Sequence, residues 1–218
     1  MAVLDWLIGC LTPHECLGCG REGALLCALC SDLLPEIPNR CYRCRKVTKD
    51  SQTCQKCRKA SRLAAVYVCT EYEGVAKDLI GRLKFSGAQA AARSIAQALA
   101  PLLTTHTVIV PVPTATSRVR RRGYDQAKLI AKRLARQTGL EYRDCLARLG
   151  QAHQVGASRQ QRLKQLSGAY RIKRPLKANQ TVLLVDDVLT TGATLEGAAA
   201  TLKSAGIKRI EAIVFAQA

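Results

Sequence analysis

The chain contains 218 residues, of which 48% are hydrophobic and 23% are charged. This composition excludes a weakly hydrophobic, disordered polymer and predicts a mainly globular protein. The 34 Lys and Arg residues outnumber the 16 Asp and Glu residues, which leaves a formal net charge of +18.

The positive charge is concentrated in one segment. Residues 118–177 hold seventeen basic and three acidic residues, whereas residues 1–60 hold nine basic and six acidic residues. Because no strongly apolar face accompanies this charge, it favours a polyanionic partner, nucleic acid before membrane. A solvated basic surface without a partner is the alternative.

The first eleven residues are apolar but are interrupted by Asp5. They lack the basic start and the small-residue cleavage site of a secretory signal. No run approaches the ~20 apolar residues that span a bilayer, and the longest alanine-rich stretch is interrupted by Arg93 and Gln97. We therefore expect a cytoplasmic protein without membrane insertion.

Eight of the eleven cysteines fall in four CxxC pairs near the N-terminus. Two thiolates separated by two residues can face one metal ion, and two such pairs complete the tetrahedral sulfur shell of zinc, with Zn–S bonds of ~2.3 Å. The pairs therefore predict two structural zinc ions, which would supply much of the folding free energy of residues 1–60. The predicted ligands are Cys16, Cys19, Cys27, Cys30, Cys41, Cys44, Cys54 and Cys57.

Other interpretations of the CxxC pairs are weaker. A disulfide framework does not suit a reducing cytosol, and redox chemistry would need one special pair beside a strand-to-helix turn. Sequential pairing, first with second and third with fourth, is the simplest arrangement, and a crossed one stays open. Cys10, Cys69 and Cys145 lie outside the pattern and are expected to be ordinary semi-buried cysteines.

From residue 61 onward, strand-like and helix-like stretches alternate. Strands are predicted at residues 63–69, 108–112, 168–172, 181–185 and 210–215, and helices at 75–84, 88–103 and 192–205. A further helix has its buried face at Ala127, Ile130, Ala131 and Leu134. The alternation predicts an α/β fold of the doubly wound type with a mainly parallel sheet. This domain of residues 61–218 would follow a small Cys-rich zinc-binding domain of residues 1–60.

The segment of residues 182–195, VLLVDDVLTTGATL, carries the chemistry. Its apolar run ends in Asp186 and Asp187, whose carboxylates can accept hydrogen bonds from the vicinal hydroxyls of a ribose. Backbone N–H groups at the following helix start, close approach at Gly192 and threonine hydroxyls form a cradle for a phosphate. Neither the Walker pattern nor GxGxxG is present. The segment therefore predicts a site for a ribose 5-phosphate.

This order of strand, acidic pair, TTGAT loop and helix resembles the signature of the type I phosphoribosyltransferases. The resemblance implies their fold and a site for phosphoribosyl pyrophosphate (PRPP) with Mg²⁺. It assigns the ribose hydroxyls to the acidic pair Asp186 and Asp187. It assigns the 5-phosphate to Thr190, Thr191, Gly192, Ala193 and Thr194.

The pyrophosphate loop of such a site should follow an earlier strand. The resemblance places it after the predicted strand at 108–112, at Pro113, Thr114, Ala115 and Thr116. In the family a nitrogen nucleophile displaces pyrophosphate at C1, which needs charge stabilisation and water exclusion more than a strong base. No general base is evident in the sequence. Glu196 is interpreted as a favourable charge near the start of its helix.

The whole chain resembles the ComF family (competence protein F, ComFC-like), in which a double zinc ribbon precedes a phosphoribosyltransferase domain. The similar stretches are KFSG at residues 84–87, VPVP at 110–113, RGYDQ at 122–126, Gln154, Arg162, and GAY at 168–170. Asp125 and Gln165 depart from the pattern, since both positions commonly carry Asn. The family implies a role in natural transformation, handling incoming single-stranded DNA, often with a helicase-like partner.

The basic segment agrees with a DNA-handling role. A basic track along this segment would be extended by Arg171, Lys173, Arg174 and Lys177. The arginines before Tyr124 would alternatively form a lid over the pyrophosphate. The candidate nucleic-acid residues are Arg118, Arg120, Arg121, Arg122, Tyr124, Lys128 and Lys132.

Two rival functions stay open from the sequence. One is a metabolic phosphoribosyltransferase that transfers ribose 5-phosphate from PRPP to a nitrogen base. The other is a sensor that binds PRPP without turnover and signals through the zinc region. Whether the protein is an enzyme is left open, and no catalytic residue is assigned.

Overall fold

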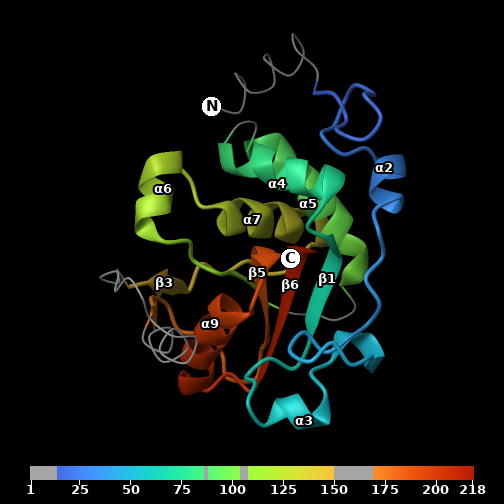
Figure 1. Ribbon diagram of the computed structural model, residues 1–218. Coiled ribbons are helices and arrows are strands. Elements are labelled where there is room, and N and C mark those ends of the chain that lie inside the picture. The colour runs from blue at the N-terminus through green and yellow to red at the C-terminus, as the bar shows by residue number, and fades with distance from the viewer. Residues whose placement is uncertain (1–13, 86–87, 104–107, 150–168) are drawn as a thin grey trace, which may run out of the picture.

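The computed structural model describes residues 14–85, 88–103, 108–149 and 169–218. Its centre is a sheet of four parallel strands in the order β1-β6-β5-β2 (Figure 1). The expected α/β class with a parallel sheet is confirmed. The strands are β1 (Val66–Glu71), β2 (Val108–Pro111), β5 (Thr181–Leu189) and β6 (Arg209–Gln217).

Helices cover both faces of this sheet. On one face, α4 (Gly74–Phe85), α5 (Ala88–Leu99) and α7 (Gln126–Thr138) form one core cluster with β5 and β6. On the other face, α9 (Ala193–Ser204) packs with the antiparallel pair of β3 (Leu146–Arg148) and β4 (Tyr170–Ile172).

The residues of β5 divide between these two cores. Leu183 and Val185 belong to the first cluster, whereas Val182 and Leu184 belong to the second. The period-2 alternation of a strand therefore makes both faces of β5 apolar, as expected for a central parallel strand.

β5 is longer than the sequence predicts. We expected the strand to end at Val185, but its ladder with β6 continues through Asp186↔Val214 and Val188↔Ala216 to Leu189. The ladder continues because β6 itself runs to Gln217, two residues beyond its predicted end at residue 215. The acidic pair is consequently held on a hydrogen-bonded strand and not in a loop.

Other element boundaries also differ from the prediction. The helix expected at 88–103 ends at Leu99, and Pro101 lies in a short 3-10 turn, η2 (Ala100–Leu102). The short helix α6 (Thr116–Arg122) was not predicted, because its sequence TSRVRRR has almost no apolar periodicity. It ends at Gly123, which adopts a left-handed φ of 80°. None of the helices in the described ranges is long and apolar enough to cross a membrane.

The Cys-rich region is extended and runs along the β1 side of the sheet (Figure 1). Its short elements are α2 (Ala28–Asp32), η1 (Lys49–Ser51) and α3 (Gln55–Arg58). Near α2, the Leu26 N–H donates to Ser94 Oγ of α5 at 3.3 Å. Further along, Thr70 Oγ1 of β1 donates to the Pro35 carbonyl at 3.0 Å. This path covers the edge strand β1, which would otherwise expose unpaired backbone groups.

Several sequence predictions fall outside the described residues. They are the apolar residues 1–11 with Cys10, the Ser86 and Gly87 of the KFSG stretch, and Gln154, Arg162, Gln165 and Gly168.

Candidate functional site

The acidic pair lies at the carboxyl end of β5. The Asp187 N–H donates to Asp186 Oδ1 at 2.9 Å, and the Val188 N–H donates to Asp187 Oδ1 at 2.9 Å. Asp186 keeps part of its surface exposed. Burial of its carboxyl, followed by the adjacent charge of Asp187, raises the pKa of Asp186 well above its usual range. The Asp186 carboxyl therefore resists ionisation, while Asp187 Oδ1 accepts the Val188 N–H.

Lys84 supplies the counter-charge for the second carboxylate. It lies in the last turn of α4, and its Nζ is 3.3 Å from Asp187 Oδ2 and 5.9 Å from the centre of the Tyr72 ring. The sequence analysis did not assign Lys84 to the site. Its only signal was the KFSG stretch, because the contact joins elements about one hundred residues apart along the chain.

The TTGAT segment joins β5 to α9. Thr190 and Thr191 are exposed, Gly192 is buried with a φ of 74°, and α9 begins at Ala193. The Ala193 N–H points toward Thr191 Oγ1 at 3.4 Å. The first N–H groups of a helix lack intrahelical partners and carry the positive end of its dipole. This segment therefore presents hydroxyls and backbone donors suited to a phosphate.

The predicted pyrophosphate loop, residues 113–116, lies next to the acidic pair. β2 pairs with β5, and the Val112 N–H, just before the loop of residues 113–116, donates at 2.9 Å to the carbonyl of Val185, just before the acidic pair. Both loops therefore leave the same edge of the sheet from neighbouring strands, which is where open α/β sheets bind ligands.

Asp125 fixes this second loop. Its Oδ2 accepts from the Thr114 N–H at 3.0 Å, and its Oδ1 accepts from Thr114 Oγ1 at 3.1 Å. Oδ1 also caps α7 by accepting from the Lys128 N–H at 3.3 Å. Because both oxygens accept, the carboxylate satisfies donors that the single oxygen of an Asn could only share. Asp125 therefore ties the start of α7 to the loop of residues 113–116.

Two buried polar atoms beside the site have no hydrogen-bond partner within the described part of the chain. They are Gln126 Nε2, which follows Asp125, and the Tyr170 hydroxyl on β4. Burial raises the pKa of Tyr170 to about 12, an effect that Arg148 opposes and the charges of Asp186 and Asp125 reinforce. The Tyr170 hydroxyl therefore remains a donor. Unpaired buried donors are costly, so they indicate a place for ligand oxygens.

The eight CxxC cysteines gather into two clusters. One holds Cys16, Cys19, Cys27 and Cys30, the other Cys41, Cys44, Cys54 and Cys57, with the sulfur atoms of each within 4.8 Å of one another. The pairing is thus sequential, which settles the alternative left open by spacing. Four sulfur ligands suit structural zinc and leave no open coordination position for catalysis. Of the cysteines outside the clusters, Cys69 is half-buried and Cys145 is buried.

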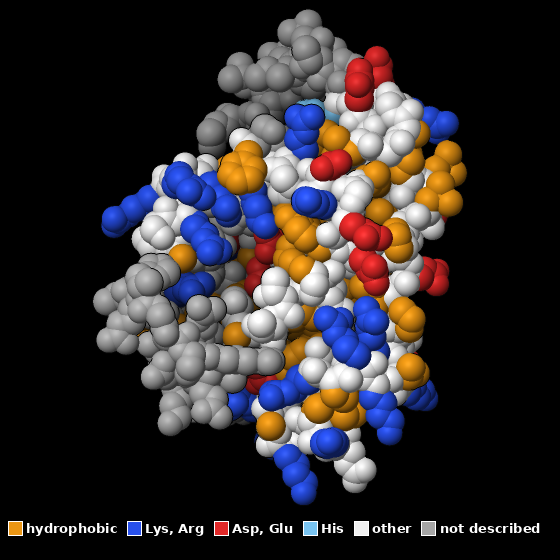
Figure 2. Space-filling view, in the orientation of Figure 1, with side chains coloured by type: hydrophobic (Ala, Val, Ile, Leu, Met, Phe, Trp, Pro, Cys, Tyr) orange, Lys and Arg blue, Asp and Glu red, His pale blue; other side chains and the backbone are white. Residues whose placement is uncertain are grey.

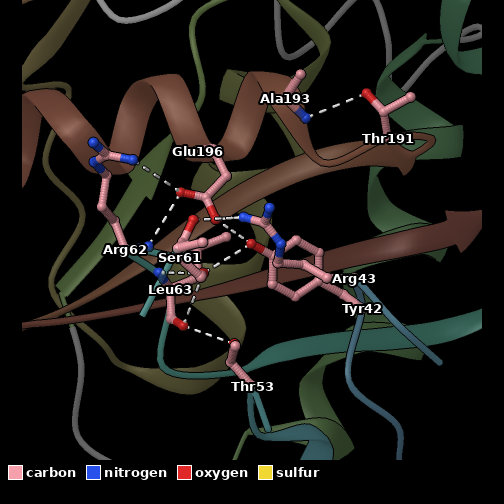
Figure 3. Close-up of polar contacts among 10 residues, drawn as sticks. Tyr42, Arg43, Thr53, Ser61, Arg62, Leu63, Thr191, Ala193 and Glu196 are labelled. Carbon is pink, nitrogen blue, oxygen red and sulfur yellow. Dashed lines mark hydrogen bonds and ion pairs between the residues drawn. The ribbon is translucent and has the colours of Figure 1, made fainter. Parts of the chain in front are cut away.

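Glu196, in the first turn of α9, joins the second cysteine cluster to the site (Figure 3). It is 8% exposed and accepts a hydrogen bond from the Tyr42 hydroxyl. Arg43 Nη1 lies 3.4 Å from Glu196 Oε1, and the Arg62 N–H donates to Oε2 at 3.1 Å. The sequence interpretation of Glu196 as a favourable charge at a helix start was incomplete, because its main partners come from the Cys-rich region.

The candidate nucleic-acid residues divide into two groups. Arg118, Arg120 and Arg121 are exposed on α6, where Lys and Arg side chains gather in Figure 2. The others contact other residues of the chain. Arg122 stacks on the Phe85 ring, and Lys132 lies over the Tyr142 ring. The Tyr124 hydroxyl donates to the Leu83 carbonyl, and Lys128 pairs with Asp144.

Phe85 is a surface residue that the sequence indicated only as part of the KFSG stretch, without a role. It ends α4 beside α6 and is 74% exposed, with the Arg122 guanidinium 5.7 Å from the centre of its ring. A small acidic patch lies beside the basic area, where Figure 1 shows the carboxyl end of β5 (Figure 2). The basic surface and this acidic patch therefore face the same side of the molecule (Figure 2).

Comparison with known families agrees with this geometry. The family named Phosphoribosyl transferase domain matches residues 87–218, more than half of the chain. The chain belongs to this family. The match contains both loops at the sheet edge and α9, whereas Lys84 and the cysteine clusters lie before it.

Individual relatives of this phosphoribosyl transferase domain carry competence names. Competence protein F of Haemophilus influenzae is 33% identical over 107 residues, 47% of each chain. Competence protein ComFC of Streptococcus pneumoniae is 28% identical over 64% of this chain and 62% of its own. That of Bacillus subtilis is 35% identical over 46% and 40%. The matches span about half the length of these relatives, and the expected resemblance to the ComF group is confirmed.

A solved structure is also similar in part. The structure of the allosteric regulatory enzyme of purine biosynthesis aligns with 58% of this chain and 25% of its own. Its sequence identity is 19% and its TM-score is 0.41, a likeness too low to bear on function.

The raised pKa of Asp186 predicts a cost to stability that increases with pH. The unfolded chain releases this proton at a lower pH than the folded chain, so stability falls as pH rises from the unfolded pKa toward the folded one. We expect Asp186→Asn to remove this fall and to raise the unfolding midpoint at neutral pH. Thermal unfolding of both proteins from about pH 4 to pH 8 measures it.

Asp144→Asn is the matched control. Burial raises the pKa of Asp144, but hydrogen bonds from Lys173 and Lys128 outweigh burial and leave it lowered. The stability from Asp144 is therefore present above the unfolded pKa, and its loss should lower the midpoint at neutral pH. Parallel pH profiles for wild type and Asp186→Asn would contradict the account of the acidic pair.

Proposed function

We propose that the protein binds PRPP with Mg²⁺ and handles incoming single-stranded DNA in the cytoplasm as part of the competence machinery. The observation that carries the PRPP proposal is the acidic pair on β5, followed directly by a glycine-containing loop that opens α9. In this proposal Asp186 and Asp187 accept from the ribose hydroxyls. The 5-phosphate is held by Thr190, Thr191, Gly192, Ala193 and Thr194, and the pyrophosphate by Pro113, Thr114, Ala115 and Thr116.

The chemistry of these groups supports a ligand with phosphate at both ends of a ribose. Helix-start N–H groups and threonine hydroxyls are donors for the 5-phosphate, while carboxylate oxygens are acceptors for hydroxyls. Gln126 Nε2 and the Tyr170 hydroxyl add buried donors without partners among the described residues. Mg²⁺, a hard cation that prefers oxygen ligands, would be held largely by the pyrophosphate itself.

A second candidate is transfer of the ribose 5-phosphate to a nitrogen base. The two unpaired donors favour it, because they offer hydrogen bonds to a polar acceptor beside the carboxylates. This function requires pyrophosphate release that depends on Asp186 and Asp187 and on an added base. A screen of free bases and DNA that yields no pyrophosphate would exclude it and leave PRPP binding as the role of the site.

The surface beside α6 supports the DNA part of the proposal. Single strands bind to positively charged tracks that carry aromatic platforms, since every base can stack on a ring. Phe85 is such an exposed ring, its partner Arg122 lies on α6, and the same helix carries the exposed Arg118, Arg120 and Arg121. Relatives named for competence support the same role. A helicase-like competence protein is the expected partner.

Loss of the acidic pair should weaken PRPP binding. We expect Asp186→Asn/Asp187→Asn to weaken calorimetric binding of PRPP with Mg²⁺ by at least ~100-fold, because neutral amides replace both carboxyl groups and make weaker hydrogen bonds with the ribose hydroxyls. Asp144→Asn, which removes a carboxylate outside both loops, should bind as wild type does. Wild-type protein that takes up no PRPP, or equal affinity in the double variant, would refute the proposal.

Loss of the exposed cations and ring should weaken DNA binding in different ways. Replacing Arg118, Arg120 and Arg121 by Ala should reduce the salt slope for oligo(dT) binding by about 2, at ~0.7 for each phosphate contact. Phe85→Ala should cost about 1–3 kcal/mol with little change in slope, as expected for one stacked base. Fluorescence anisotropy across a salt series measures both quantities.

Two controls match these changes. Lys46, Lys49 and Lys56 are exposed on the Cys-rich region, so their joint replacement by Ala changes the net charge equally. Val47 is as exposed as Phe85, at 74%, but offers no ring. Losses of the same size in the controls, or DNA binding that does not respond to salt, would count against an interface at α6.

A further inference from the structure

Tyr42 lies between the second cysteine cluster and the TTGAT loop. It is the residue after Cys41, inside the Cys41–Cys44 pair that forms this cluster with Cys54 and Cys57. Only 7% of its surface is exposed. The side chain therefore projects from the metal-binding backbone into the phosphoribosyl transferase domain.

The ring of Tyr42 packs against the glycine of the loop. A Cβ atom added to Gly192 would lie 2.8 Å from Tyr42 Cε2 and 3.1 Å from Cδ2, closer than side chains approach one another. Gly192 also has a φ of 74°, a backbone conformation that residues other than glycine rarely adopt. Glycine is thus required here both by its own backbone and by the ring that covers it.

The hydroxyl of Tyr42 reaches the helix that follows the loop. It donates to Glu196 in the first turn of α9 and lies 2.8 Å from Ser61 Oγ (Figure 3). One side chain therefore contacts both Gly192, where the loop ends, and Glu196, one turn into α9. The N–H groups that point to the phosphate position lie between these two contacts.

The backbone around the second cluster is anchored to residues 60–63, which lead into β1, and to Glu196. Thr53, next to the ligand Cys54, donates from Oγ1 to the Leu63 carbonyl at 2.7 Å. Arg43 donates from Nη1 to the Ala60 carbonyl at 2.6 Å while facing Glu196. The position of the Tyr42 ring is consequently set by the folded cluster and not by a mobile side chain alone.

We propose that Tyr42 is a positioning residue for the 5-phosphate of PRPP, and that closure of the second cysteine cluster by zinc presents it. The ring holds Gly192 in its left-handed conformation, and the hydroxyl holds the first turn of α9. Tyr42 acts through Gly192 and Glu196, not on the ligand. This inference rests on the proposed PRPP site and adds the Cys-rich region to it.

Comparing the affinities for ribose 5-phosphate and for pyrophosphate distinguishes this role from a general loss of structure. Calorimetry with each ligand and Mg²⁺ should show Tyr42→Ala weakening ribose 5-phosphate by about tenfold, the effect of one displaced hydrogen-bonding group. Pyrophosphate, which would bind at residues 113–116, should change by less than about twofold. Tyr42→Phe keeps the ring contact and should recover part of the affinity. Equal losses for both ligands, or no loss in either variant, would overturn the inference.

Coupling between Tyr42 and Gly192 gives a second readout. Gly192→Ala should cost less affinity in a Tyr42→Ala background than in wild type, because the ring that its methyl group would meet is gone. Strictly additive losses would overturn the inference. If wild type binds neither PRPP nor ribose 5-phosphate, the proposed function itself fails, which is a different outcome from wild-type binding that is indifferent to Tyr42.

Discussion

The buried carboxylate of Glu196 connects the two parts of this protein. Glu196 is only 8% exposed, and a buried carboxylate lowers the stability of the folded chain unless it is paired and hydrogen-bonded. Glu196 is satisfied by the Tyr42 hydroxyl, the Arg43 guanidinium and the Arg62 backbone N–H, all from the N-terminal side of β1. Burial of this carboxylate in the first turn of α9 is therefore compensated largely by residues of the second cysteine cluster's own segment.

The acidic pair shows a related compromise between stability and binding. Asp186 stays at the end of a buried strand although burial raises its pKa and its ionisation opposes folding. Asp187 is compensated by Lys84, and Asp125 organises the neighbouring loop with both carboxylate oxygens. Groups that are costly in the folded chain gather at one edge of the sheet, as expected where a ligand is to be bound.

Local patterns predicted much of the fold and of the candidate site. The apolar run VLLV predicted a strand, and the TTGAT loop indicated a helix start just beyond it. The CxxC spacing identified all eight cysteines of the two clusters. These features are short in sequence, so spacing and residue type were enough.

Features that depend on tertiary contacts could not be predicted in this way. The extension of β5 through the acidic pair depends on the length of β6, and the pairing of Lys84 with Asp187 joins distant elements. The contact of Tyr42 with Gly192 joins the second cysteine cluster to the TTGAT loop. Nothing in either local sequence indicates its partner, because such contacts are fixed only when separate elements pack together.

Hydrogen exchange of the backbone at residues 186–196 tests most directly whether the Cys-rich region helps to build the phosphoribosyl site. The measurement compares wild type with Cys54→Ser/Cys57→Ser, each with and without PRPP and Mg²⁺. Our account predicts that PRPP slows exchange of this segment in wild type and fails to do so when the second cluster is opened. Equal protection by PRPP in both proteins would contradict it.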